Sequence, residues 1–170
     1  MTAKKASETK VFMSELVFPN DTNFYGNLMG GRLMYWMDTA AAMAAGKHCK
    51  LPAATVSVDN LSFDEPIRLG NVVHIEATVT RAFNTSMEIH INVWGEDLTK
   101  NYKYKSNEAY FTFVAIDSEG RPRKVPELIP ESDEEVKLFE GALRRRQLRL
   151  VLAKKMRPDE ATELKALFVK

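Results

Sequence analysis

Apolar residues recur at three- and four-residue intervals after the Gly30-Gly31 pair, and this spacing predicts one long amphipathic helix. Its apolar face is expected to carry Leu33, Met34, Met37, Ala41, Ala44 and Ala45. We place the end of this helix near Gly46, because glycine tolerates the left-handed conformation at a helix C-terminus. Residues 18–29, just before the helix, bring proline, asparagine and glycine close together, which indicates a loop.

Alternation of apolar and polar residues predicts strands on both sides of this helix, at residues 11–18, 54–63, 72–83, 87–93 and 108–117. A change of phase at Asp59-Asn60 predicts a bulge, and residues 95–103 form a polar excursion. Short turns allow antiparallel neighbours, so the pattern predicts an α+β arrangement of one helix against an antiparallel sheet. A single helix leaves part of the sheet and its edges uncovered, which favours oligomerisation.

Beyond Ser118 the chain becomes rich in proline and charge, and then a second helix is predicted. Ser132 is a good N-cap, and Glu135 completes a capping box with it. Apolar residues of this helix are Val136, Phe139 and Leu143, and we expect the sequence RRRQLR on its far side. Pro158 can start a last short helix.

Composition places the chain among soluble globular proteins. Its 170 residues suffice for one domain, and 45% hydrophobic with 28% charged residues is ordinary for that class. The net charge of +1 gives no overall basic field for nucleic acid. The single cysteine, Cys49, fits a reducing cytoplasm. Without a secretory h-region or an apolar run of about 20 residues, we expect a cytoplasmic protein with neither a nucleic-acid nor a membrane partner.

Several standard catalytic motifs are missing from the sequence. It has no G-x-S-x-G elbow of a serine esterase, no C-x-x-C pair and no H-E-x-x-H metal motif. His48 and Cys49 are adjacent, and neighbours on a helix point about 100° apart, so they cannot pair well as nucleophile and base. His74 and His90 are expected on solvated strand faces. A solvated helix face is also the default for the arginine run Arg144, Arg145, Arg146 and Arg149.

Asn23 and Asp38 remain as candidates for chemistry, with Gly30 and Gly31 between them. An isolated aspartate on a helix is ordinarily a polar residue on the helix flank. Backbone N–H groups at a helix N-terminus can, however, hold an oxyanion, and glycine lets a ligand approach closely. A carboxylate base, an orienting amide and an N–H cradle are the parts needed to attack a carbonyl group with water.

Five stretches resemble, in chain order, the acyl-coenzyme A thioesterases of the hotdog fold: PNDTNFYGNLMGGRLMYWMD, TVSVDNLSF, NTSMEI, AYFTFVAID and GRPRKVP. The resemblance covers roughly residues 10–150. It is to the single-domain bacterial acyl-CoA hydrolases and to either half of the duplicated cytosolic enzymes of vertebrates. It implies an antiparallel five-stranded sheet wrapped around the long helix, with a C-terminal helical extension. The expected domains are a flexible leader at 1–8, the hotdog domain at 9–125 and a loop and helical tail at 126–170.

The resemblance also implies an activity: hydrolysis of a fatty acyl-CoA to free fatty acid and coenzyme A (CoA), with no metal, cofactor or prosthetic group. It places the catalytic asparagine at Asn23, the catalytic aspartate at Asp38 and the N–H group that polarises the thioester carbonyl at Gly31. Residues expected to bind CoA are Thr85 and Ser86 along the pantetheine channel, and Arg121, Arg123 and Lys124 near the nucleotide phosphates.

In the resembling family two chains pair their sheets side by side, and three such dimers commonly form a hexamer. The Asn23 loop of one chain is then expected to face the Asp38 helix of the other. A non-catalytic acyl-CoA sensor on the same fold is an alternative, although such a sensor could lose Asn23 or Asp38. A hotdog dehydratase would want a histidine near the helix start, and none lies between Gly26 and Gly46. Trp36 either packs in the core or trims the acyl tunnel.

Overall fold

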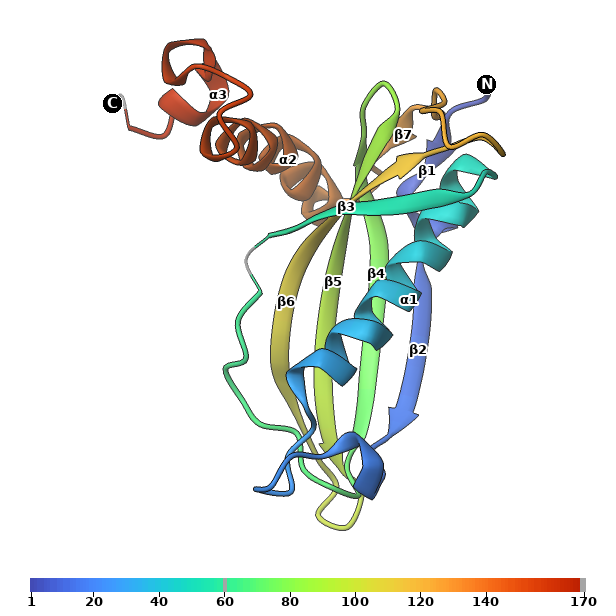
Figure 1. Ribbon diagram of the computed structural model, residues 1–170, viewed down its shortest axis with the longest axis vertical. Coiled ribbons are helices and arrows are strands. Elements are labelled where there is room, and N and C mark those ends of the chain that lie inside the picture. Colours follow the sequence, from blue (N-terminus) through green and yellow to red (C-terminus); the bar gives the residue numbers. More distant parts are fainter. Residues whose placement is uncertain (60, 169–170) are drawn as a thin grey trace.

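A curved antiparallel sheet wraps around one long helix in the computed structural model, which describes residues 1–59 and 61–168 (Figure 1). The helix is α1 (Gly30–Cys49), and the five-stranded sheet has the order β2-β4-β5-β6-β3. The strands are β2 (Val11–Leu16), β3 (Ala53–Asp59), β4 (Val72–Ala82), β5 (Ser86–Asp97) and β6 (Tyr102–Ala115). This arrangement confirms the α+β class and the hotdog fold expected from the resemblance.

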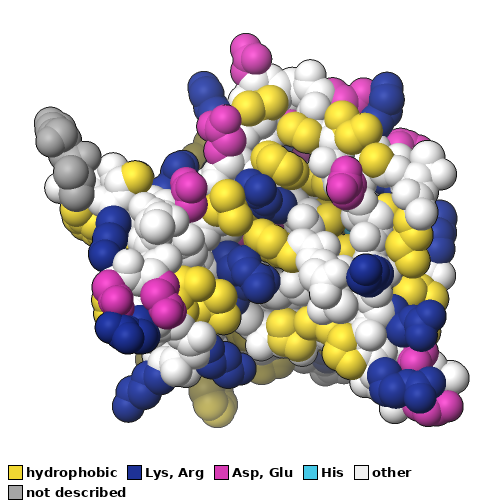
Figure 2. All heavy atoms as spheres, turned by 90° about the horizontal axis from the view of Figure 1, so that it is seen from above, with side chains coloured by type: hydrophobic (Ala, Val, Ile, Leu, Met, Phe, Trp, Pro, Cys, Tyr) yellow, Lys and Arg dark blue, Asp and Glu magenta, His cyan; other side chains and the backbone are white. Residues whose placement is uncertain are grey.

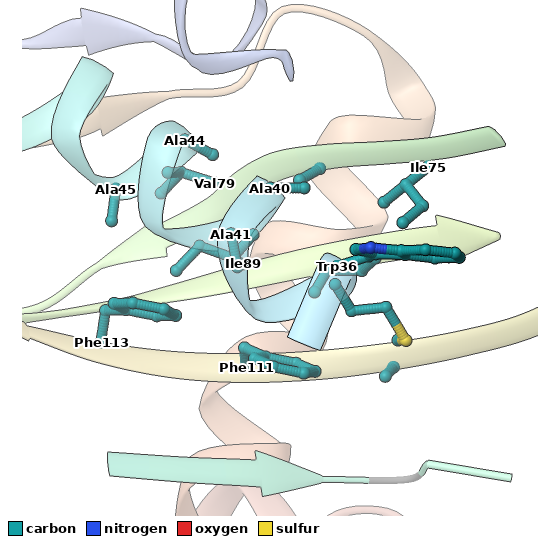
Figure 3. Close-up of a cluster of buried hydrophobic side chains, with 14 of the residues drawn as sticks. Trp36, Ala40, Ala41, Ala44, Ala45, Ile75, Val79, Ile89, Phe111 and Phe113 are labelled. Carbon is teal, nitrogen blue, oxygen red and sulfur yellow. The ribbon is translucent and has the colours of Figure 1, made fainter. Parts of the chain in front are cut away.

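The core lies between α1 and the concave face of the sheet. Small side chains on α1 let the helix approach the strands closely, and Figure 3 shows them facing large residues of the sheet. The fully buried apolar residues of the helix are Met37, Ala40, Ala41, Ala44 and Ala45, and those of β4 and β5 include Val73, Ile75, Val79, Met87, Ile89 and Ile91. Trp36 is only 8% exposed and packs in this core, whereas Met34, expected on the apolar face, is 37% exposed.

The helix does not end at Gly46, as the glycine suggested, but continues to Cys49. Lys50 takes the left-handed conformation instead, with φ of 56°, and its N–H donates to the carbonyl of Gly46 at 2.9 Å. A non-glycine residue can adopt this conformation at a modest cost. Packing of Ala44, Ala45 and the following turn therefore outweighs the local preference of Gly46 for a helix end.

The strands differ in length from the sequence prediction. β3 ends at Asp59, and β5 and β6 meet at a turn of residues 98–101, so the polar excursion is much shorter than 95–103. The register irregularity of β3 falls between Thr55 and Ser57, and Asp59 stays paired with Tyr110, so the bulge at Asp59-Asn60 stays a prediction. Asn60 itself lies outside the described residues.

The N-terminal residues make specific contacts with the body of the protein. The two-residue strand β1 (Lys4–Lys5) pairs in parallel with β7 (Leu128–Ile129), and the short 3₁₀ helix η1 (Ala6–Thr9) follows. Thr9 is buried, and its hydroxyl oxygen accepts a hydrogen bond from the backbone N–H of Val79 at 3.0 Å. Part of the segment expected to be a flexible leader therefore has defined partners. The division of the chain at residues 8 and 125 stays a prediction.

The C-terminal segment forms a helical arm that projects from one end of the sheet (Figure 1). It contains α2 (Asp133–Leu152), the 3₁₀ turn η3 (Pro158–Glu160) and α3 (Thr162–Lys165). The capping box is confirmed: Ser132 Oγ accepts from the N–H of Glu135, and Glu135 Oε2 accepts from the N–H of Ser132, both at 3.2 Å. Within the described residues, no helix has the length and apolar character needed to cross a bilayer.

Three arginines of α2, Arg145, Arg146 and Arg149, turn toward the sheet, which contradicts the expectation of a solvated far side for them. Arg145 donates to both carboxylate oxygens of Glu88, at 2.7 and 3.0 Å, and its guanidinium lies 4.0 Å from the ring centroid of Tyr110. Glu88 is only 1% exposed. At Ser86 and Glu88, the outward positions of β5 next to α2, arginine side chains of α2 take the place of water.

Candidate active site

Asp38 and Thr55 form the central pair of the candidate site. Thr55 lies on the edge strand β3 opposite Phe113, whose side chain is buried, and so it shares the concave face with α1. Its hydroxyl donates to Asp38 Oδ1 at 2.6 Å. Among the described residues no donor contacts Asp38 Oδ2. One carboxylate oxygen is therefore held in place while the other is available to a water molecule.

Sequence reasoning identified Asp38 but missed Thr55. Threonine in an alternating strand ordinarily faces solvent. No rule of sequence spacing pairs a residue of a strand, such as Thr55, with a residue of the preceding helix, such as Asp38. The available signal was local: Thr55 opens the alternating stretch that follows the helix, at the end of the predicted strand nearest to the helix C-terminus. A register irregularity of β3 follows directly after Thr55.

The N-terminus of α1 offers free backbone donors. The N–H groups of Gly30 and Gly31 donate no hydrogen bond to any described residue, and Met29 provides no side-chain cap. At Gly30 a Cβ atom would lie 3.1 Å from the ring of Phe63, so this position has little room for a side chain. At Gly31 the same test meets open space. An oxyanion could therefore approach the N–H of Gly31, where the helix dipole favours negative charge.

Asn23 belongs to the loop that leads into α1. Its side-chain oxygen accepts from the N–H groups of Tyr25 at 3.0 Å and Asn27 at 3.2 Å, which fixes the loop and the amide. Asn23 lines a cavity of about 280 Å³ together with Gly30, but Asp38 is not part of that lining. The structure thus places Asn23 beside the helix N-terminus, and no hydrogen bond among the described residues joins it to the Asp38 of its own chain.

Large apolar side chains are exposed around this loop and the first half of α1. Phe24 and Tyr25, next to Asn23, are 106% and 88% exposed, and Tyr35 on the helix is 62% exposed. Isolated exposed apolar residues are normal, but a group of aromatic residues beside a candidate site marks an interaction surface. Met29 and Met34, at the start of α1, are 38% and 37% exposed.

The residues expected to bind CoA meet at the end of the sheet shown in Figure 2. Thr85 and Ser86 lie at the β4–β5 turn, and the carbonyl of Asn84 accepts from the N–H of Val125 at 3.1 Å, so residues 121–125 run beside this turn. Arg121 is paired with Asp117 and Glu119, at 3.0 and 2.8 Å, and Arg123 approaches Asp117 at 3.9 Å. Lys124 is exposed.

Asp117 compensates much of the positive charge in the 121–124 segment. The backbone N–H of Arg121 lowers the pKa of Asp117, and the Arg121 side chain lowers it further, so this carboxylate is ionised at neutral pH. Arg121 is consequently engaged within its own turn.

The histidines do not form a catalytic or metal site. His48 is fully buried, and its Nε2 donates to the carbonyl of Pro126 at 2.8 Å. His90, expected to be solvated, is only 8% exposed and lies 2.8 Å from Glu108, while His74 contacts Ser14 and Glu96. Across residues 1–59 and 61–168, no group of three or more histidine, cysteine, aspartate or glutamate side chains is placed so that it could hold a metal ion. The expectation of no metal or prosthetic group stays a prediction.

Comparison with known protein families matches residues 25–101 to the thioesterase superfamily. Among curated proteins, the chain is 38% identical over 138 residues to YkhA of Bacillus subtilis, described as an uncharacterized acyl-CoA thioester hydrolase. That match covers 81% of this chain and 80% of the relative. The chain is also 43% identical over 145 residues to acyl-coenzyme A thioesterase 11 of mouse, covering 85% of this chain but only 24% of that longer protein.

Solved structures with the same architecture include an acyl-CoA hydrolase of Staphylococcus aureus in complex with butyryl-CoA, CoA and CoA disulfide. Its TM-score is 0.82 at 35% identity, over 90% of this chain and 95% of the other. A hexameric acyl-CoA thioesterase has a TM-score of 0.87 at 31% identity, over 90% of this chain and 98% of the other.

Further structures of the Staphylococcus aureus hydrolase carry alanine in place of an asparagine, an aspartate or a threonine. Those three replaced residues are spaced along that sequence as Asn23, Asp38 and Thr55 are spaced here. The same three residue types, at the same intervals, are thus present in this chain.

Proposed function

Because the chain belongs to the acyl-CoA thioesterases of the thioesterase superfamily, we propose that it hydrolyses fatty acyl-CoA thioesters at a site centred on Asp38. The observation that carries this site is the 2.6 Å hydrogen bond from Thr55 to Asp38 Oδ1, which leaves Oδ2 free to accept from water. The spacing of Asn23, Asp38 and Thr55, shared with the residues replaced in the Staphylococcus aureus hydrolase, supports the assignment.

In the proposed mechanism Asp38 is the general base. Its Oδ2 takes a proton from a water molecule whose oxygen attacks the thioester carbonyl carbon, and Thr55 holds the carboxylate in orientation. The N–H of Gly31 stabilises the negative charge that develops on the carbonyl oxygen. The carbon–sulfur bond then breaks, the CoA thiolate leaves, and a proton returns from Asp38 to the sulfur. The products are a free fatty acid and CoA.

We further propose that a second copy of the chain completes each site. The exposed Phe24 and Tyr25 beside Asn23, and the separation of Asn23 from Asp38 within one chain, support a dimer in which the loop of one protomer covers the α1 helix of the other. The hexameric relative supports a trimer of dimers. Light scattering should give a dimer or a multiple of it, and a stable, active monomer at micromolar concentration would exclude a shared site.

The proposed reaction needs no metal or cofactor, since Asp38 and water supply the chemistry. We place the protein in the cytoplasm, where a lone cysteine stays reduced. The pantetheine arm of CoA would pass along Thr85 and Ser86. Its nucleotide phosphates would contact Arg123 and Lys124, and Arg121 would contribute only if released from Asp117 and Glu119.

Release of a free thiol from acyl-CoA tests the proposed function. Wild-type protein incubated with palmitoyl-CoA and a thiol-reactive dye should produce a signal that an Asp38→Ala variant loses. The alternative, a non-catalytic acyl-CoA sensor, predicts saturable binding of acyl-CoA by the wild type with no thiol released.

A further inference from the structure

Two of the α2 arginines are already paired with carboxylates of the sheet. Arg145 makes a bidentate pair with Glu88, and Arg149 Nη1 lies 2.8 Å from Asp59 Oδ2. Both pairs are largely shielded from water, with arginine side chains 19% and 17% exposed. These two arginines bind the helix to the sheet, and their positive charges are compensated by Glu88 and Asp59.

Arg146, between them in sequence, is different. Within the described part of the chain no carboxylate lies within ion-pair distance of it, and its side chain reaches Ser86 Oγ only at 3.5 Å. Its guanidinium lies 4.5 Å from the centroid of the Phe83 ring. Burial lowers the pKa of Arg146, and the nearby charge of Arg149 lowers it further. A partly desolvated guanidinium next to another cation is an electrostatic arrangement that an anion would stabilise.

The position of Arg146 narrows the choice of anion. Ser86 is the first residue of β5, directly after the Asn84-Thr85 turn that residues 121–125 flank. Figure 2 views this end of the molecule and shows lysine and arginine side chains gathered where the C-terminal arm meets the body. Arg121 is engaged by Asp117 and Glu119, and Arg81 donates to the carbonyl of Phe139 at 3.0 Å. Arg146 and Lys124 have no carboxylate within ion-pair distance among the described residues.

The same region lies close to the proposed reaction centre. Thr55 is paired with Phe113 and Ser86 with Val114, which are consecutive residues of β6. Thr55 and Ser86 are therefore at the same level of the sheet, two strand spacings or about 10 Å apart. Their side chains point to opposite faces, because neighbours on β6 alternate. The flexible pantetheine arm of a thioester held at Asp38 and Thr55 would pass over the end of the sheet and reach Arg146.

We propose that Arg146 binds phosphate groups at the nucleotide end of the acyl-CoA substrate and thereby selects CoA thioesters over thioesters that lack the nucleotide. This inference rests on the proposed hydrolase function and adds a specificity-determining residue on α2. A guanidinium suits the role because it presents a planar fork of donors to phosphate oxygens. The guanidinium of Arg146 packs on the ring of Phe83, next to the Asn84–Ser86 turn.

A comparison of two substrates tests the role of Arg146. The wild type, Arg146→Gln and Arg146→Lys are assayed with an acyl-CoA and with the acyl-pantetheine of the same chain length. Loss of a charge-assisted hydrogen bond to phosphate should raise KM for acyl-CoA roughly tenfold to a hundredfold in Arg146→Gln, with kcat little changed. Kinetics with acyl-pantetheine should stay the same, and Arg146→Lys should recover part of the loss.

Arg144→Gln is the matched control, since it removes the same charge two positions earlier on α2 and points elsewhere on the helix. It should leave both substrates unaffected. Independently of any variant, adenosine 3′,5′-bisphosphate should inhibit wild-type hydrolysis of acyl-CoA competitively.

The inference is overturned if Arg146→Gln keeps wild-type KM for acyl-CoA, if both substrates weaken equally, or if Arg144→Gln has the same effect. Absence of inhibition by the bisphosphate, or equal KM values of the wild type for both substrates, also overturns it. Failure of the proposed function is a separate result, because then the wild type would hydrolyse neither thioester.

Discussion

Replacing Asp38 by asparagine isolates the proton-accepting role of the carboxylate. Asparagine keeps the size of the side chain, and its Oδ1 can still accept the hydrogen bond from Thr55 that measures 2.6 Å in the structure. At the position of Oδ2, however, an amide NH₂ would point a donor at the water molecule that must give up a proton. The substitution therefore removes basicity at one atom while the contact to β3 is retained.

The expected loss can be worked out for both members of the pair. Removal of a general base lowers rates typically by about 10²–10⁴, so kcat of Asp38→Asn should fall within that range with KM nearly unchanged. A hydrogen bond to a charged group contributes roughly 1.5–3 kcal/mol. Because Thr55 is exposed in the single chain, the lower figure applies, and Thr55→Val should lose about tenfold in kcat.

Steady-state thiol release with one acyl-CoA measures these effects, and circular dichroism with size-exclusion chromatography confirms that each variant keeps its fold and assembly. Thr55→Ser is the matched control, since it retains the hydroxyl and should stay within about threefold of wild type. Near-normal kcat in a folded Asp38→Asn variant would show that Asp38 is not the general base but an ordinary polar residue on the helix flank. A Thr55→Ser loss as large as that of Thr55→Val would show that the hydrogen bond is not the cause.

Three further predictions concern the assembly, the α2 interface and a buried histidine. Co-expression of inactive Asn23→Ala and Asp38→Ala chains should restore about a quarter of wild-type activity, since half of randomly paired dimers are mixed and each then has one intact site; no recovery in mass-verified mixed dimers would place each site within one chain. Glu88→Gln should lower the free energy of unfolding by about 3 kcal/mol, because Arg145 loses the negative charge that compensates it in a buried pair; an unchanged denaturant midpoint would contradict this. Burial lowers the pKa of His48, so the unfolded state takes up a proton before the folded state does as pH falls below about 6.5. The free energy of unfolding should therefore be at its full value above this pH and decline below it. In His48→Gln the free energy of unfolding should depend less on pH.

The sequence was sufficient for the helix, the strands and their inward faces, because each depends on a period that neighbouring residues set. Val73, Ile75 and Val79 alternate in the sequence and are all buried in the structure. Long-range competition decided the remaining details. Gly46 has the local preference for a helix end, yet tertiary packing carries α1 to Cys49.

The convex face of the sheet shows a different limit of sequence reasoning. Glu88 and His90 follow the pattern of solvated strand residues, and the α2 arginines follow that of a solvated helix face. Neither strand residue is solvated: Glu88 pairs with Arg145 of α2, and His90 lies 2.8 Å from Glu108 on the neighbouring strand β6. Periodicity identifies which side of an element is polar but does not identify what covers that side. The same limit applies to Thr55, whose partner Asp38 lies on another element.

The geometry of α1 itself argues that the proposed site is shared between chains. Gly31 and Asp38 are on the same helix, and their seven-residue separation corresponds to about 10 Å along its axis. Asn23 lines a cavity with Gly30, at the same end of the helix as Gly31 and away from Asp38. The oxyanion donor and the amide therefore form one half of the machinery, and Asp38 with Thr55 forms the other half. A two-fold axis that places the first half of each chain against the second half of its partner completes two sites at once and covers Phe24 and Tyr25.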